Sequence, residues 1–368
     1  MSGKGEERVD NLRPDINRFL TALRREEPDR VPLSEFLMDP PVKEAFIGRH
    51  VGNSLIGIDD YDVEADVAFW HAAGYDYIHL APWYLHLFPE GWNVKQGQYS
   101  EYSAGPVDKA WMEEHQGVIR SRQDVERYPW PDTSQVKYDH IRRALEILPA
   151  GMGLTTGTWG ILETSRQLMG FEGMALALYD DPGLVEAVIE HIGSFLLDVF
   201  KQAASIPGVS ALWLADDIAH ASGFFFSPGF YRRTLFPWFK RYGDVAASRN
   251  VPLIYHCDGV FWDIIPDLVE CGITALQPIE PKAMDIVEVK RKWGKHLALI
   301  GNIDLGHALT RGTPQEVEAE VRQRLRELAP GGGYCLGSSN SIASYVPLAN
   351  YKAMIEATFR WGEYPIRA

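Results

Sequence analysis

The sequence predicts an α/β fold in which eight parallel strands close into a (β/α)8 (TIM) barrel. Eight short apolar runs recur along the 368 residues, and stretches with helical spacing of apolar residues lie between most of them. Strands that alternate with helices form βαβ units, and such units place their strands in a parallel sheet. An open, doubly wound sheet built from the same units is the alternative architecture.

The apolar runs are short and bounded by turn-forming residues, which is typical of buried parallel strands. The expected strands are 31–36, 75–80, 153–156, 211–215, 253–256, 274–277, 297–300 and 334–337. The expected helices are 64–73, 140–148, 183–204, 228–248, 261–271, 284–293, 314–329 and 348–361. Two of these helices have clear start signals, because Ser227 and Thr313 each precede a proline, as an N-cap residue does.

A long excursion, 81–136, follows the second expected strand and is rich in aromatic residues. These are Trp83, Tyr84, Trp92, Tyr99, Tyr102 and Trp111. A loop of this length is typical of a lid over the mouth of a barrel, and simple packing of a long connection is the alternative. We expect one domain over 1–368, with this insertion and a flexible tail at 1–15.

The composition restricts the class of protein. A formal net charge of −14 argues against nucleic acid or an anionic membrane surface as partner, because both carry the same sign. The chain lacks an apolar run near the ~20 residues that a membrane-spanning helix needs. The charged N-terminus does not resemble a signal peptide, and three cysteines do not make a disulfide framework. We therefore expect a cytoplasmic location.

Polar side chains follow nearly every expected strand. In a barrel of this kind the active site lies where the carboxyl ends of the strands meet, so these residues are the candidates for function. They include Glu35, His79, Thr156, Asp216, Asp217, His256, Asp258, Glu280, Asn302, Asp304 and Asn340.

His256 and Asp258 are the most informative pair. They stand two residues apart at the end of an apolar run, and in an extended chain such side chains project to the same face. An imidazole beside a carboxylate can bind a metal ion or relay a proton. The alternative is a histidine that supports a turn closed by Asp258 and Gly259.

The acids divide into an adjacent pair and two single residues. Adjacent residues on a strand face opposite ways, so we expect either Asp216 or Asp217 to enter the mouth while the other caps or pairs. Glu280 and Asp304 each follow a strand after a few loop residues, where they contact substrate or stabilise the loop. We assign catalytic candidates to Asp216, Asp217, Glu280 and Asp304, because acids that share a site suit acid–base work. Substrate contacts are expected from Glu35, His79, Thr156, Asn302 and Asn340.

With these residues in view, the chain resembles the uroporphyrinogen decarboxylase (URO-D) superfamily. The segments that carry the resemblance are 27–32, 168–172, 216–217, 227–231, 256–259, 301–304, 331–334 and 346–350. The resemblance implies a (β/α)8 barrel enzyme, and family members often form homodimers.

Two branches of this superfamily differ in their site residues. True decarboxylases carry an arginine-rich segment, RQAGR, where this chain has SEFLM at 34–38. Corrinoid-linked methyltransferases bind zinc through an HxCG motif and a later cysteine. His256 matches that histidine, whereas Asp258 and Asn340 stand where the two cysteines are expected. A zinc ion or a harder divalent ion at His256 and Asp258, completed by Asp217 or Glu280, agrees with these residues, and a metal-free site stays open.

The resemblance favours the methyltransferase side. It implies transfer of a methyl group from a small O-, N- or S-methylated substrate to or from a corrinoid protein, assisted by a metal at His256 and Asp258. A metal-free decarboxylase or other lyase is the second hypothesis. A non-catalytic protein that binds a tetrapyrrole or another ligand is the third.

Overall fold

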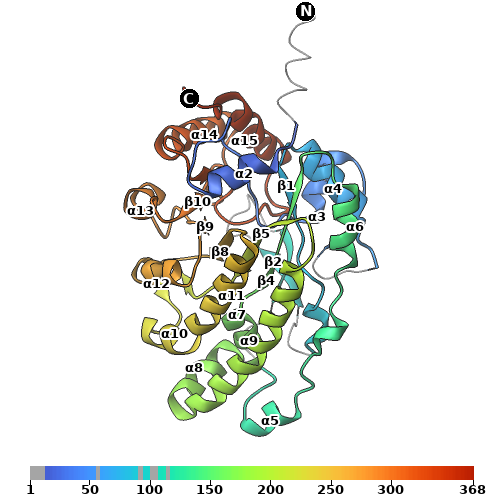
Figure 1. The fold of residues 1–368 in the computed structure, drawn as a ribbon, viewed down its shortest axis with the longest axis vertical. Helices are drawn as coiled ribbons and strands as arrows, with labels where there is room; N and C mark the ends of the chain where they lie inside the picture. The colour runs from blue at the N-terminus through green and yellow to red at the C-terminus, as the bar shows by residue number, and fades with distance from the viewer. Residues whose placement is uncertain (1–12, 55–58, 90–93, 100–106, 113–116) are drawn as a thin grey trace, which may run out of the picture.

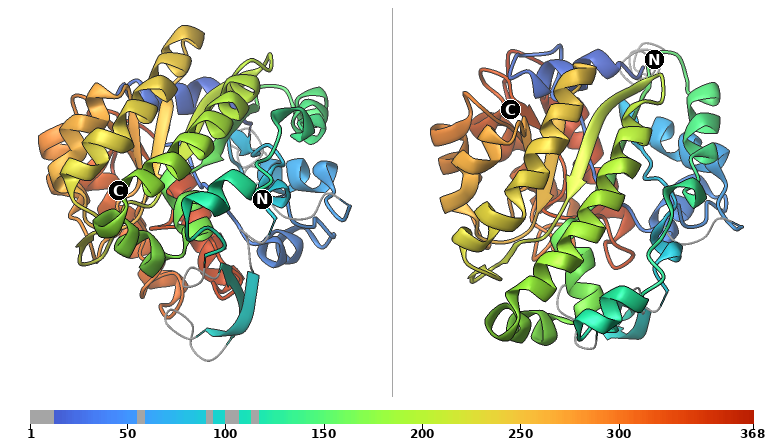
Figure 2. Two further views of the ribbon diagram at one scale, coloured as in Figure 1. Left: turned by 90° about the horizontal axis from the view of Figure 1, so that it is seen from below. Right: turned by 60° about the horizontal axis from the view of Figure 1, so that its bottom comes forward.

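The computed structural model describes residues 13–54, 59–89, 94–99, 107–112 and 117–368. Its main sheet has seven parallel strands in the order β1-β4-β5-β8-β9-β10-β11. They are β1 (Tyr77–His79), β4 (Gly153–Trp159), β5 (Val209–Ala215), β8 (Leu253–Cys257), β9 (Ala275–Pro278), β10 (Ala298–Ile300) and β11 (Tyr334–Cys335). Helices surround this curved sheet (Figures 1 and 2), and the fold is the predicted (β/α)8 barrel.

The eighth position of the barrel is occupied by the segment expected as its first strand, 31–36. This segment forms only an isolated parallel bridge, between Leu33 and Leu336, so the expectation of a full strand is wrong. Pro32 has no N–H to donate, although its carbonyl accepts from the N–H of Leu336. On the other side the contact with β1 is through a side chain, because the hydroxyl of Tyr77 donates to the carbonyl of Glu35 at 3.0 Å.

Helices surround the sheet, and most of them cover its outer face. They are α2 (Ile16–Leu23), α3 (Pro40–Ile47), α4 (Val63–Ala72), α5 (Arg122–Arg127), α6 (Asp139–Ile147), α7 (Ile161–Met169), α8 (Phe171–Asp180), α9 (Pro182–Ala204), α10 (Pro228–Thr234), α11 (Phe236–Arg249), α12 (Ile265–Glu270), α13 (Ile286–Trp293), α14 (Pro314–Leu328) and α15 (Leu348–Trp361). In Figure 1, α2 lies at the upper end of the barrel and α5 and α8 at the lower end. Among the described helices, none combines the length and the apolar character needed to span a bilayer.

The strands alternate between two hydrophobic clusters, as the period of two along a strand requires. Ala211, Trp213 and Ala215 of β5 point into the barrel, whereas Leu212 and Leu214 pack against the outer helices. Residues of α2, among them Phe19 and Leu23, join the inner cluster. The barrel is therefore filled by side chains and closed by α2 at one end, which leaves the opposite end for a site.

The expected helix starts are confirmed, and one expected helix is divided. Thr313 accepts from the N–H of Glu316 in a capping box, and Ser227 accepts from the N–H of Phe230. The helix expected at 228–248 is two helices, α10 and α11, which separate at Leu235. Pro237 explains the break, because proline inside a helix removes one hydrogen bond and clashes with the preceding turn.

The aromatic insertion has structure of its own. It contains an antiparallel hairpin of β2 (Val94–Tyr99) and β3 (Val107–Met112). Trp83 stacks on His140 with ring centroids 3.8 Å apart, and the hydroxyl of Tyr84 accepts from the N–H of Trp159. These two side chains are buried packing residues. Trp92 and Tyr102, and the side chains of Tyr99 and Trp111, lie outside the described residues, so a lid stays a prediction.

The flexible tail expected at 1–15 falls only in part on residues that the structure describes. Residues 1–12 lie outside the described part of the chain. Asp15 is fixed, because its side chain caps α2 and its N–H donates to Asp76 at 2.9 Å.

The packing of α11 on α12 allows a direct test of the fold. A Cβ atom at Gly243 would lie 1.8 Å from the carbonyl oxygen of Cys271. Gly243→Ala should therefore destabilise the protein by about 1–3 kcal/mol or more, because backbone must move. Gly173→Ala on α8 is the matched control, since a Cβ there meets nothing within 4 Å. It should gain about 0.5–1 kcal/mol from helix propensity. Chemical denaturation of both variants measures the difference, and equal effects would contradict the packing.

Candidate active site

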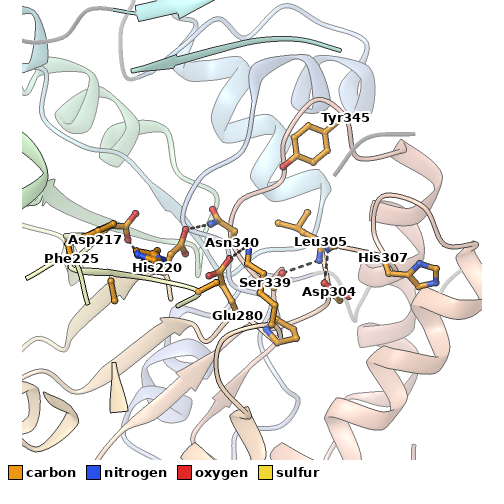
Figure 3. A pocket seen from close by; sticks show the side chains of 16 residues that line it. Asp217, His220, Phe225, Glu280, Asp304, Leu305, His307, Ser339, Asn340 and Tyr345 are labelled. Carbon is orange, nitrogen blue, oxygen red and sulfur yellow. Dashed lines mark hydrogen bonds and ion pairs between the residues drawn. The ribbon is translucent and has the colours of Figure 1, made fainter. Parts of the chain in front are cut away.

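A cavity of about 740 Å³ opens at the carboxyl end of the strands. The loops after β5, β8, β9, β10 and β11 form its walls. Side chains that line it include Asp217, His220, Phe225, Asp258, Glu280, Lys282, Asp304, His307, Ser339, Asn340 and Tyr345. Figure 3 shows how most of them lie around the cavity.

Three potential metal ligands meet beside this cavity, and two of them, Asp217 and Asp258, line it. Asp217, His256 and Asp258 each present a ligand atom, and these three atoms lie within 4.8 Å of one another. They come from the ends of β5 and β8, which pair in register at Ala215 and His256. Parallel pairing of adjacent strands therefore brings together residues that are about forty positions apart in sequence.

The imidazole of His256 is held in one tautomer. The side-chain amide of Gln277 donates through Nε2 to the carbonyl of Asn340 at 3.0 Å, so its Oε1 faces His256 Nδ1 as an acceptor. Nδ1 therefore carries the proton, and Nε2 keeps a lone pair. Within the described residues Nε2 has no hydrogen bond, and the residue is only 8% exposed. The ring of Phe36 stacks on this imidazole with centroids 4.7 Å apart.

Asp258 is also oriented from outside the cluster. Its Oδ2 accepts from Asn340 Nδ2 at 2.5 Å, while its buried Oδ1 has no hydrogen-bond partner among the described residues. Burial, together with the nearby charges of Asp217 and Glu280, raises the pKa of Asp258 well above its usual range. A cation bound here would relieve that repulsion and satisfy the orphaned oxygen. One nitrogen and two carboxylate oxygens thus fit a divalent ion with a position left open.

Asp217 and Glu280 are placed by backbone donors. The N–H of Asp258 donates to Asp217 Oδ1 at 2.8 Å, and the N–H of Gly259 donates to Glu280 Oε2 at 3.0 Å. Glu280 Oε1 lies 3.4 Å from the ammonium of Lys282. Both carboxylates therefore line the cavity in fixed positions.

The side chain of Asp216 turns away from the cavity. It accepts from the N–H groups of Leu162 (3.0 Å) and Glu163 (2.9 Å) at the start of α7. Burial raises the pKa of Asp216 to about 7. The adjacent acids thus separate as expected, with Asp217 in the mouth and Asp216 at a helix terminus.

Four other candidates are buried beside the cavity instead of lining it. Glu35 accepts from both the N–H and the hydroxyl of Ser338 at 2.7 Å. His79 contacts the hydroxyl of Thr155 at 3.0 Å, and burial lowers its pKa to about 3. Asn302 donates to the carbonyl of Ile279 at 2.7 Å, and Thr156 Oγ1 is buried without a hydrogen-bond partner in the described structure. Asp304 and Asn340 line the cavity.

Sequence reasoning gave no role to several residues of this site. Gln277 is the most important of them, and the register His256↔Gln277 between β8 and β9 places it beside the imidazole. Aligning the two apolar runs at their carboxyl ends would have found it. Lys282, His307 and Tyr345 lie in loops beyond the main sheet, and His220 lies in β6 (Ala219–His220), a two-residue strand that pairs with β7 (Gly223–Phe224). Segments this short have no periodic spacing of apolar residues from which a side-chain direction could be predicted.

Comparison with known proteins identifies the family. The uroporphyrinogen decarboxylase (URO-D) family matches residues 111–361, so the chain belongs to this family of barrel enzymes. A methylated-thiol–coenzyme M methyltransferase of Methanosarcina mazei is 26% identical over 193 residues, which cover 52% of this chain and 48% of that relative. A uroporphyrinogen decarboxylase of Alcanivorax borkumensis is 23% identical over 361 residues, covering 93% of this chain and 96% of the relative.

A solved structure supports the same fold. A methyltransferase from Methanosarcina mazei superposes with a TM-score of 0.67 at 19% identity, covering 93% of this chain and 97% of the other. The match to the curated methyltransferase spans less than half of that protein's length. The family and the fold are therefore shown, and the reaction is a separate question.

The burial of Glu35 predicts a pH-dependent stability. Burial raises the pKa of Glu35 from 4.5 to about 8. The folded state therefore holds this proton more tightly than the unfolded state, so the contribution is complete below pH ~4.5 and is lost as pH rises to about 8. Glu35→Gln keeps both contacts with Ser338 and cannot ionise. Relative to this variant, the wild type should lose up to about 1.4 kcal/mol per pH unit in that window. Denaturation at pH 5 and pH 8 measures it, and a constant difference would contradict the prediction.

Proposed function

We propose that this protein transfers a methyl group from a small O-, N- or S-methylated substrate to or from a corrinoid protein, with help from a divalent metal ion. The observation that carries the proposal is the cluster of Asp217, His256 and Asp258 at the cavity wall, with the Nε2 lone pair of His256 available. The similarity to a methyltransferase of Methanosarcina mazei supports it.

Asp217, His256 and Asp258 would hold the ion. Gln277 and Asn340 would orient two of these ligands. Gln277 keeps the proton on Nδ1 of His256, and Asn340 fixes one oxygen of Asp258. A bound zinc or other divalent ion would act as a Lewis acid that polarises the heteroatom bonded to the methyl group. Nitrogen and carboxylate donors agree with zinc and with harder divalent ions.

Glu280 is our candidate for proton transfer, because it lines the cavity next to the cluster. The charge of Glu280 contributes to the raised pKa of Asp258, so the two carboxyl groups interact electrostatically. The ammonium of Lys282 lies 3.4 Å from Glu280 Oε1. A charged carboxylate there can accept a proton from a substrate hydroxyl or ammonium.

Decarboxylation of a polycarboxylate is less compatible with this cavity. The guanidinium of Arg166 packs over the ring of Phe225, 4.3 Å from its centroid, and Arg232 pairs with Asp267 at 2.8 Å. Neither arginine lines the cavity, whereas Asp217, Glu280 and Asp304 do. Guanidinium groups that grip carboxylates in pairs are what a polycarboxylate requires.

The metal proposal predicts that zinc stabilises the folded protein and binds in a stoichiometric amount. Zinc at about 100 times its Kd should stabilise the folded wild type by about 2.7 kcal/mol, provided that the unfolded chain does not bind. Asp217→Asn and His256→Ala should each remove most of this gain and the metal found by elemental analysis. Asp304→Asn is the control, because Asp304 lines the cavity outside the cluster, and it should keep both. Absence of stoichiometric metal in wild type purified without chelators would favour acid–base catalysis instead.

The branch of the family can be tested with the named substrate of its decarboxylases. Uroporphyrinogen carries eight carboxylates, and like charges ~4 Å apart repel by roughly 4 kcal/mol at an effective dielectric constant of about 20. We expect no meaningful decarboxylation when the anaerobically reduced porphyrinogen is incubated with the protein and the products are separated by carboxyl number. Efficient formation of the four-carboxylate product would show that the methyltransferase proposal is wrong.

A further inference from the structure

The described residues that line the cavity have an uneven balance of charge. Four carboxylates line it, from Asp217, Asp258, Glu280 and Asp304, and Lys282 is the single lysine or arginine among the described lining residues. A divalent ion at Asp217, His256 and Asp258 would offset two of these charges. The cavity would remain negative even then, because Lys282 offsets only one more.

The remaining charge is concentrated at Asp304. Lys282 lies beside Glu280, 3.4 Å away, and so compensates the acid next to the cluster. Asp304 Oδ1 accepts from the N–H of Gly306 at 2.7 Å. In the described structure its other oxygen has no hydrogen bond, and the carboxylate has no ion pair. Glu320, whose Oε1 accepts from the N–H of Asp304 at 3.1 Å, places a second carboxyl group behind it.

Asp304 and the metal cluster lie at different ends of the cavity. Figure 3 shows Asp217 on one side of the labelled residues and Asp304 on the other, with Ser339, Asn340 and Glu280 between them. A substrate that reaches both ends must carry two distinct groups. The ring of Tyr345 also lines the cavity and offers a face that attracts cations.

We propose that the substrate is a cation, in which the methylated heteroatom faces Asp217, His256 and Asp258 while a separate positive group faces Asp304. This inference rests on the proposed function for the first of these groups and on the charge of the cavity for the second. Asp304 is then the residue that selects for charge. The substrate class is methylated ethers, thioethers or amines with an ammonium group elsewhere, and anions such as sulfonates or carboxylates are rejected.

A series of three methyl ethers of similar size tests the charge preference. The cation is (2-methoxyethyl)trimethylammonium, the neutral isostere is 1-methoxy-3,3-dimethylbutane, and the anion is 2-methoxyethanesulfonate. The quaternary ammonium, tert-butyl and sulfonate groups coordinate metal ions poorly, so differences in affinity report on the charge of the cavity. Calorimetric titration of the wild type should give a Kd for the cation at least about tenfold lower than for the anion, with the isostere between them. The preference should weaken as NaCl is added.

Matched variants assign the preference to Asp304. Asp304→Asn keeps the shape of the side chain and should reduce the ratio of cation to anion affinity to below about threefold. The zinc-dependent stabilisation should persist in this variant, which separates charge selection from metal binding. Glu356→Gln, on the exposed side of α15, is the control for net charge and should leave the ratio unchanged.

The possible outcomes are distinguishable. Equal or tighter binding of the anion, or an unchanged ratio in Asp304→Asn, would overturn the inference while leaving the metal proposal intact. A wild-type protein that binds no metal but still prefers the cation would overturn the metal proposal and leave the charge preference of the cavity intact. With zinc saturating the cluster, MgCl2 is compared with NaCl of equal ionic strength. If MgCl2 then abolishes the preference far more strongly in the wild type but not in Asp304→Asn, Asp304 binds an inorganic cation and the inference is wrong.

Discussion

The hydrogen bond between Gln277 and His256 is the contact on which the candidate site depends. Gln277 is itself oriented by the carbonyl of Asn340, so residues from the ends of β9 and β11 fix the imidazole at the end of β8. Without this contact the ring could carry its proton on Nε2 or rotate, and the cluster with Asp217 and Asp258 would lose its nitrogen donor. The geometry requires a closed barrel, since β8, β9 and the chain after β11 must converge at one end.

Burial assigns different tasks to acids that look alike in sequence. Asp216 and Asp217 are adjacent, yet one satisfies two N–H groups of α7 and the other faces the cavity. Glu35 follows the same rule, because Ser338 supplies two donors and removes its carboxyl group from the cavity. A carboxyl group far from solvent needs such donors. The cavity acids Asp217, Asp258, Glu280 and Asp304 each accept a hydrogen bond in the described structure, and they face a space that a cation or a substrate can enter.

The strands and helices that the spacing of apolar residues marks were predictable from the sequence. The contacts that depend on how strands pair with one another were not. Seven expected strands overlap the observed ones, because apolar runs reflect burial directly. The segment 31–36 was placed correctly in the barrel but lost its ladder at Pro32. The choice between Asp216 and Asp217 needed the position of α7, for which no helix was expected. Gln277 was recognised as a polar residue at a strand end, but its contact with His256 and the position of Lys282 were not predicted, because cross-strand register and loop direction are tertiary properties.

The replacement of two expected cysteines by Asp258 and Asn340 has a physical consequence for the proposed chemistry. Asn340 donates to Asp258 through its amide, so it acts as a support for that carboxylate and Asp217 supplies the third donor. Thiolates pass more electron density to a metal ion than carboxylates do, and a site of oxygen donors leaves the ion a stronger Lewis acid. Such a site polarises an ether or amine more effectively than it stabilises a soft thiolate. A metal-bound thiolate carries the same charge as a carboxylate, so this replacement does not itself make the cavity more negative. The acids that would oppose an anionic substrate are those outside the cluster, Glu280 and Asp304.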